Sequence, residues 1–115
     1  MATNIKVLAS MSITSASTSS SPLSVYPLSG TKSALVTSVS LYNTAPTNTA
    51  DVFLGIRNGS STPAYFYKVP ALAGNGSQTM NDVVSLRAVD GDAVVAYFTG
   101  TGGPINCIVF GIERD

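Results

Sequence analysis

The sequence lacks the residues on which many catalytic sites depend. Its 115 residues include no histidine, no tryptophan and one cysteine, Cys107. A disulfide within the chain, a Cys/His zinc site and a histidine-based catalytic triad are therefore excluded. A nucleophilic cysteine needs a basic partner, so Cys107 is instead expected to lie in the core as a small apolar residue. We expect no catalytic residue, no metal site and no cofactor, and we predict that the protein is not an enzyme.

Charge is scarce as well. Charged residues make up 10% of the chain, with six basic and six acidic residues and a formal net charge of zero. Nucleic acids and anionic membrane surfaces attract proteins with a surplus of Lys and Arg, so neither partner is expected. No run approaches the ~18 apolar residues of a transmembrane helix, and residues 1–13 do not resemble a signal peptide. Because a small free monomer usually carries net charge, the neutrality indicates that something else covers much of this surface.

The residues that are abundant are typical of an all-β protein. Ser and Thr together make 28 residues, beside twelve Val, whereas the helix formers Glu and Gln occur once each. Alternating apolar segments separated by Gly, Pro, Asn and Ser predict an antiparallel β-sandwich of about eight strands, jelly-roll or immunoglobulin-like. No segment is predicted to be helical. The segments predicted to be extended are residues 5–13, 23–26, 32–42, 51–57, 64–69, 77–80, 83–89, 93–99 and 105–112.

Period-two alternation also predicts which face of each strand is buried. A one-residue slip in a strand would reverse the assignment. The predicted core consists of Leu35, Val39, Leu41, Val52, Leu54, Ile56, Val95, Tyr97, Ile108 and Phe110.

The chain is predicted to divide into an N-terminal arm with a linker, residues 1–22, and a sandwich domain, residues 23–115. The arm alternates like a strand from Ile5 to Ile13, and the linker that follows is rich in Ser and Thr. We expect the arm to contact a neighbouring protein, with Ile5 and Val7 as candidate contacts; the alternative is pairing within its own sheet. On the first hypothesis, deletion of residues 2–20 leaves the sandwich folded.

Three other motifs have two possible interpretations each. Tyr65 and Tyr67 are expected on one strand face, with Phe66 on the other, either as a sugar-stacking platform or in a mixed core and surface role. Asp90 and Asp92 flank Gly91 and form either part of a Ca²⁺ site or a plain turn, and the turn is expected because the rest of a calcium loop is missing. The Asn-Gly-Ser triplets at residues 58–60 and 75–77 match the N-glycosylation sequon, but without a secretory signal they are interpreted as turns.

Four short motifs follow one another between residues 41 and 113. They are LYNT at 41–44, VPALAG at 69–74, LRAVDGD at 86–92 and VFGIE at 109–113. From Val25 onward, their order resembles a family of small virion proteins of tailed bacteriophages. The resemblance implies a capsid decoration (cement) protein, a neck or tail attachment, or a fibre component. In the family pattern the Gly-Asp before a strand is structural, which agrees with the turn interpretation of Asp92.

The leading hypothesis for function is a decoration protein that stabilises the phage head by bridging major capsid subunits. The resemblance implies that it resides in the virion after assembly in the host cytoplasm, and that it forms a homo-oligomer, with a trimer favoured by the threefold positions of capsids. An uncharged, Ser/Thr-rich surface suits this role, because burying it strands no charge. The alternative is a tail, neck or fibre sandwich that binds a host-surface glycan through Tyr65 and Tyr67.

Overall fold

The computed structural model describes residues 5–14, 22–28, 30–59, 62–81, 83–88 and 91–114, and within these residues it contains nine strands. Each predicted extended segment is a strand, with ends that differ from the prediction by at most three residues. Within the described part of the chain, no helix is long and apolar enough to cross a membrane. The strands are β1 (Lys6–Ile13), β2 (Leu23–Pro27), β3 (Ser33–Asn43), β4 (Ala50–Asn58), β5 (Ala64–Leu72), β6 (Ser77–Met80), β7 (Val84–Arg87), β8 (Asp92–Gly100) and β9 (Ile105–Arg114).

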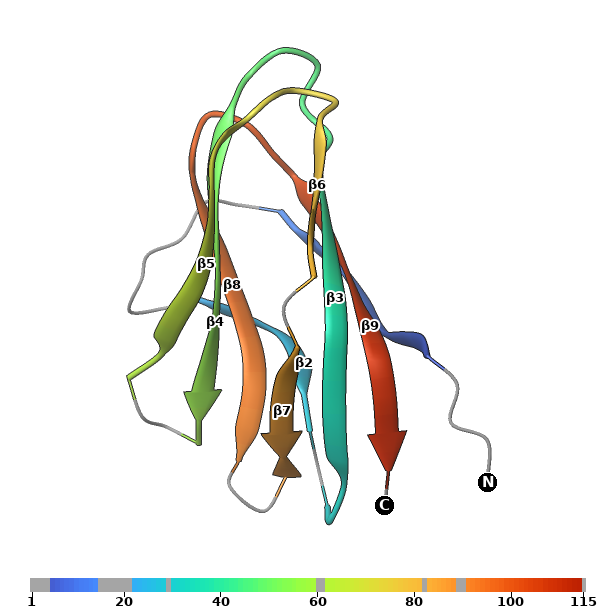
Figure 1. Ribbon diagram of the computed structural model, residues 1–115. Coiled ribbons are helices and arrows are strands. Elements are labelled where there is room, and N and C mark those ends of the chain that lie inside the picture. The colour runs from blue at the N-terminus through green and yellow to red at the C-terminus, as the bar shows by residue number, and fades with distance from the viewer. Residues whose placement is uncertain are drawn as a thin grey trace.

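The nine strands form two antiparallel sheets that pack face to face, as Figure 1 shows. The five-stranded sheet has the order β1-β9-β3-β6, and β7 pairs with the other end of β3. The four-stranded sheet has the order β2-β8-β4-β5. This arrangement confirms the predicted all-β sandwich, and its strand order is that of a jelly roll, with β6 and β7 together occupying one strand position.

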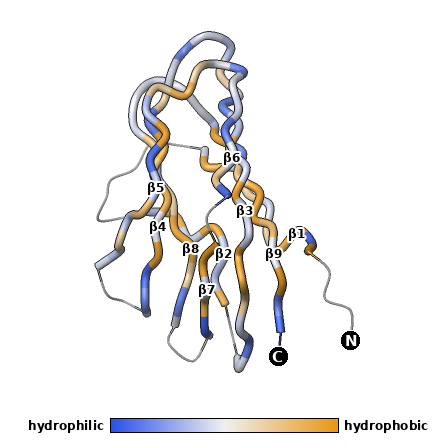
Figure 2. The backbone as a smooth tube through the Cα atoms, viewed as in Figure 1, coloured by the Kyte–Doolittle hydropathy of each residue, from blue (hydrophilic) through white to orange (hydrophobic). Residues whose placement is uncertain are grey.

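The core lies between the two sheets and contains much of what alternation predicted. Val39 and Leu41 of β3 and Val52 and Leu54 of β4 are fully buried there, which confirms their assignment. Ile56 is partly buried and packs against the same cluster. In Figure 2 hydrophobic residues run along β3, β8 and β9, so that both sheets contribute apolar surface to the contact between them.

Strand β8 is buried on both of its faces. Val94, Ala96 and Phe98 point toward the facing sheet and belong to the central cluster. Val95 and Tyr97 are also buried, as predicted, but they alternate with the inward residues and therefore lie on the outer side of the four-stranded sheet. The apolar run of β8 thus belongs to a central strand covered on both sides, where alternation carries little information.

The five-stranded sheet contradicts the core prediction at three positions. Leu35, Ile108 and Phe110 face outward, and Leu35 is 38% exposed. Along β9 the inward positions are instead taken by Cys107 and Val109, which are fully buried. The sequence of β9 is apolar on both faces, so its alternation fits either orientation, and the prediction that Ile108 and Phe110 face the core is wrong.

A β-bulge at Thr37 explains the error at Leu35. The register of β3 against β9 shifts at this residue, and a bulge reverses the alternation, so Val36 faces the core and Leu35 does not. The Thr37 hydroxyl donates to the carbonyl oxygen of Phe110 at 3.3 Å. Gly111 stands opposite Val36, where a Cβ would lie 2.2 Å from the carbonyl oxygen of Leu35, so the close approach of the two strands requires glycine.

Strand β1 pairs with β9 of the same chain, which is the alternative that the sequence left open. Met11 stands opposite Cys107, and Ile13 stands opposite Ile105 and is only 2% exposed. The strand therefore contributes to the core as well as to the sheet. The division of the chain at residue 22 stays a prediction, and residues 15–21 of the linker lie outside the described residues.

Candidate interaction surface

The outward face of the five-stranded sheet carries an apolar band that we call the outer stripe. It consists of Leu35 on β3 and Ile108, Phe110 and Ile112 on β9. The three β9 residues are half-buried and Leu35 is exposed. Their positions follow from the inward orientation of Cys107 and its neighbours, since successive side chains of a strand point to opposite faces. The outer stripe is the main feature that the sequence analysis did not predict. The sequence does indicate it, because residues 105–112 are apolar on both faces of the strand.

Short uncharged side chains flank the outer stripe. Phe110 stands opposite Ser38 on β3 and Val7 on β1, and Ile108 stands opposite Ser40 and Ser10 on the same two strands. A serine hydroxyl loses far less hydration energy on burial than a charged group does. The flanks of the stripe can therefore enter an interface with a neutral partner at small desolvation cost.

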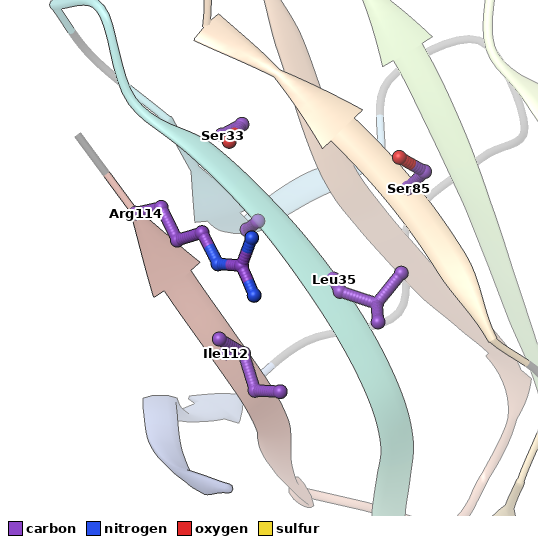
Figure 3. A pocket seen from close by; sticks show the side chains of 6 residues that line it. Ser33, Leu35, Ser85, Ile112 and Arg114 are labelled. Carbon is purple, nitrogen blue, oxygen red and sulfur yellow. The ribbon is translucent and has the colours of Figure 1, made fainter. Parts of the chain in front are cut away.

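One end of the stripe is hollowed into a shallow pocket of about 220 Å³, seen from close by in Figure 3. Leu35 and Ile112, which pair across β3 and β9, supply its apolar surface. Ser33 and Ser85 line it from β3 and β7, and Arg114 extends along it from the end of β9. The combination of aliphatic surface and one guanidinium group fits an aliphatic side chain of a partner, with a carbonyl or carboxylate group nearby.

The two predicted contacts in the arm lie beside this face. Val7 is 53% exposed and stands next to Phe110 across the pair of β1 and β9, so it extends the apolar surface sideways. Ile5 precedes β1 and is 61% exposed. Both side chains are accessible, and their role as partner contacts stays a prediction.

The tyrosine pair does not form the shared face that alternation predicted. The register of β5 against β4 shifts so that Tyr67 stands opposite Leu54 and Tyr65 opposite Gly55, which leaves Phe66 as a bulged residue. Tyr67 packs against the core between the sheets, whereas Tyr65 lies on the outer side. The two rings therefore point to opposite faces of the sheet, and the prediction that they lie on one face is wrong.

Tyr65 instead belongs to an aromatic cluster on the four-stranded sheet. The ring of Tyr97 stacks on Phe53 at 4.5 Å between centroids and meets the edge of Tyr65 at 5.1 Å. The ammonium group of Lys68 lies over the Phe53 ring at 5.3 Å. These rings cover one another, and Tyr97 is only 8% exposed. The cluster thus uses its ring faces internally, leaving little flat aromatic surface for a ligand.

The acidic residue Asp92 has a structural role at a turn. It is buried and accepts hydrogen bonds from the Asn58 side-chain amide and from the backbone N–H of Arg87, the latter at 2.9 Å. Both carboxylate oxygens are thus used to tie β8 to neighbouring segments. Asp90 lies outside the described residues. In the part of the chain that the structure describes, no group of three or more acidic, Cys or His residues is placed to hold a metal ion.

A second acidic residue links the two sheets. Glu113 of β9 accepts a hydrogen bond from the Tyr26 hydroxyl of β2 and forms an ion pair with Lys32 at 3.1 Å. The hydrogen bond from Tyr26, followed by that from Lys32, lowers the pKa of the Glu113 carboxyl. Burial, followed by the same hydrogen bond with Glu113, raises the pKa of the Tyr26 hydroxyl. The hydrogen bond from Tyr26 therefore links β9 to β2 and so joins the two sheets, while the Lys32 side chain stays partly exposed.

Burial places Cys107 in the core and raises the pKa of its thiol to about 12. We expect a disulfide reagent such as Ellman's reagent to leave the native protein unlabelled at pH 8, because the thiolate is the reacting form. Adding denaturant should give one reacted thiol per chain. Rapid labelling of the native protein would show that Cys107 is accessible, and would contradict its placement between the sheets.

Comparison with solved structures finds the same fold in chains of two phage capsids and of one virus-like particle. No protein-family model and no curated protein matches the chain. Among solved structures, it is similar to a chain in the acidic stable capsid structure of Helicobacter pylori bacteriophage KHP30, with a TM-score of 0.59 and 15% identity over 100% of this chain and 94% of that one. A chain of the cyanophage Pam1 capsid asymmetric unit gives 0.55 and 19% identity over 96% and 85%. A chain of the virus-like particle of extra small virus, from the giant freshwater prawn Macrobrachium rosenbergii, gives 0.51 and 12% identity over 98% and 79%. At these identities the similarity shows a shared fold.

Proposed function

We propose that this protein is a bacteriophage virion protein of the capsid, and that it acts as a decoration protein that bridges major capsid subunits. The observation that carries the proposal is the outer stripe, an apolar band with serine flanks on the outward face of a jelly roll. The fold shared with chains of two phage capsids supports the same conclusion. A protein in this role has no need of a catalytic site.

The chemistry of the surface suits a bound protein better than a free one. An apolar stripe exposed to water favours association, and the neutral serines around it add little desolvation penalty when a shell subunit covers them. Because decoration proteins bind in many copies to a repeated lattice, a modest affinity for each site is enough for stable attachment. We further propose that the protein binds as a homo-oligomer, with a trimer at threefold positions favoured.

The glycan-binding alternative has less support. It requires Tyr65 and Tyr67 on a common face, and the bulge at Phe66 places them on opposite faces. Tyr65 is in turn engaged edge-on with Tyr97. No specific arrangement of the described residues favours a sugar over a protein partner.

A pair of variants tests whether the outer stripe binds the shell. Leu35 and Phe66 are each 38% exposed, but Leu35 lies in the stripe and Phe66 on the other sheet. We expect Leu35→Glu to weaken binding to particles that lack this protein by about tenfold or more, since a carboxylate would be buried against apolar surface. Phe66→Glu is the matched control and should bind like the wild type. Equal binding of both variants would contradict the assignment of the stripe.

The number of copies in each phage particle distinguishes a decoration protein of the head from a protein of the neck, tail or fibre. A decoration protein should be present in hundreds of copies in each particle, measured by gel densitometry against the major capsid band. A copy number of only a few per particle would instead place the protein at the neck, tail or fibre.

A further inference from the structure

The edges of the two sheets differ in how well they are protected from pairing with another strand. An exposed edge presents unpaired backbone groups, and proteins commonly shield such edges with prolines, bulges or short strands. Strand β2 is five residues long and ends at Pro27, while β5 contains Pro70 and the bulge at Phe66. Strands β6 and β7, which share the far edge of the five-stranded sheet, have four residues each. Three of the four edges are thus poor templates for a further strand.

Strand β1 is the exception. It is eight residues long, contains no proline, and in the described residues pairs only with β9, which leaves its other edge open. Its single bulge is near its beginning, between Val7 and Ala9, and Ala9–Ile13 then pairs regularly with β9. Its one charged residue, Lys6, lies at the beginning of the strand. The second half of β1 is therefore a regular, uncharged edge.

We infer that two copies of this chain join edge to edge through β1, antiparallel to each other, so that their five-stranded sheets form one continuous sheet. The twofold axis passes close to Met11, the centre of the regular segment. This inference rests on the self-association included in the proposed function, and it names the surface and the symmetry. Backbone hydrogen bonds along β1 supply the contact, as in other cases of strand addition.

The side chains of β1 are compatible with pairing to their own copy. Around an axis at Met11, Ser10 stands opposite Ser12 of the second copy, and Ala9 stands opposite Ile13 of the second copy. Ser10 and Ser12 face outward, because they pair with Ile108 and Asn106 of β9, while Ala9 and Ile13 face the core side. Polar residues therefore meet polar residues and apolar residues meet apolar ones. The two Lys6 side chains are at opposite ends of the pair and do not repel each other closely.

The protection of the other edges determines the symmetry. A ring of copies joined head to tail would need a second open edge of a different kind, and β2, β5 and the β6–β7 edge are each shielded. A single self-complementary edge gives an isologous pair with twofold symmetry. The contact therefore joins each copy to one other copy. It links two single chains, or two trimers if the chain also forms a trimer through another surface.

The test is the mass of the assembly in solution. In the double variant Ser10→Lys and Ser12→Lys, lysines would face each other across the axis at two places. The number of chains in each assembly in solution should therefore fall by half. The matched control is Ser77→Lys with Thr79→Lys, two outward positions with the same spacing on β6 at the opposite edge. Sedimentation equilibrium at micromolar concentration is expected to give an even number of chains for the wild type and the control. An odd number for the wild type, or no change in the β1 variant, would overturn the inference.

Cross-linking tests the register directly. Ser10→Cys and Ser12→Cys proteins, mixed under oxidising conditions, should form a disulfide-linked dimer faster than either protein alone, because opposite residues of an antiparallel pair come within disulfide reach. Cys107 is buried and does not compete. Equal rates in the mixture and in the separate proteins would contradict an axis at Met11.

Binding to capsids separates this inference from the proposed function. The β1 lysine variant keeps the apolar residues of the outer stripe and should still bind particles. Its affinity should be lower than that of the wild type, because Ser10→Lys also places a charge on the flank of the stripe beside Ile108. If the wild type binds particles but has an odd number of chains, the β1 contact is wrong and the proposed function stands. If the mass falls by half as expected but no form of the protein binds particles, the β1 contact stands and the decoration role is wrong.

Discussion

Deletion of residues 2–13 is expected to abolish the cooperative unfolding transition of the protein. The deletion removes β1, and with it the buried Ile13 and the side chains of Leu8 and Met11 that pack against the core. Burial of three large apolar side chains is worth about 5–8 kcal/mol, which is comparable to the total stability of about 5–15 kcal/mol for a small domain. Loss of β1 also removes the strand neighbours of Ile105 and Cys107 on β9, which stand opposite Ile13 and Met11. Thermal unfolding followed by far-ultraviolet circular dichroism measures the effect.

Single substitutions separate the contribution of the core from that of the strand pairing. Ile13→Ala should lower the free energy of unfolding by about 2–4 kcal/mol, because it leaves a cavity at a position with 2% exposure. Val7→Ala, in the same strand but on the outer face, is the control and should cost under about 1 kcal/mol. A truncated chain that unfolds cooperatively within a few degrees of the wild type would show that β1 is dispensable. The Ser/Thr-rich composition of the linker favoured that outcome, and the pairing of β1 with β9 argues against it.

The prediction from sequence succeeded for the strands and failed where a strand departs from simple alternation. Turn residues and β-branched runs located all nine strands. Alternation then placed Val39, Leu41, Val52 and Leu54 correctly, because β3 and β4 are regular at those positions. The bulge at Thr37 shifted Leu35 to the outer face. Such bulges depend on contacts with a partner strand that is distant in sequence, so local sequence gives little warning of them.

Departures from simple alternation also explain why the candidate interaction surface was not predicted. The bulge at Phe66 separated Tyr65 from Tyr67, and the doubly apolar sequence of β9 concealed the outer stripe. A strand with apolar residues on both faces is usually interpreted as fully buried, and here the second face is half-buried at the surface. The apolar residues of β9 are visible in the sequence, but which of them face the core depends on the strand register.

The other large effect is expected at Asn43, the buried amide at the end of β3. Its side chain uses its full hydrogen-bonding capacity. The amide nitrogen donates to the carbonyl oxygens of Asn48 and Leu72, both at 2.9 Å, and the amide oxygen accepts from the N–H groups of Ala45 at 3.1 Å and Gly103 at 2.9 Å. The side chain is 0% exposed, so water cannot replace these contacts. Asn43 therefore joins two loops, residues 44–49 and 101–104, to the end of β5 at one end of the sandwich.

Asn43→Ala should lower the free energy of unfolding by about 3–5 kcal/mol, since several backbone groups lose their partner and each unsatisfied buried group costs about 1–3 kcal/mol. Chemical denaturation measures this loss. Asn106→Ala, at an exposed position of β9, is the control and should change stability by less than about 0.5 kcal/mol. A loss at Asn43 no larger than the control's would show that the loops hold together without the amide.

Asn43→Asp adds a pH test of the same network. A carboxylate keeps the acceptor role but places a buried charge beside two carbonyl oxygens, so the pKa of the introduced carboxyl should be raised above its unfolded value of about 3.9. A raised carboxyl pKa binds protons more strongly in the folded state, so stability falls as the pH rises from the unfolded pKa through the folded pKa. The variant, measured against the wild type, should therefore be most destabilised at pH 7 and partly recover toward pH 4, where the protonated group can again donate one hydrogen bond. A destabilisation that is the same at both pH values, as expected for Asn106→Asp on the surface, would contradict the donor role of Asn43.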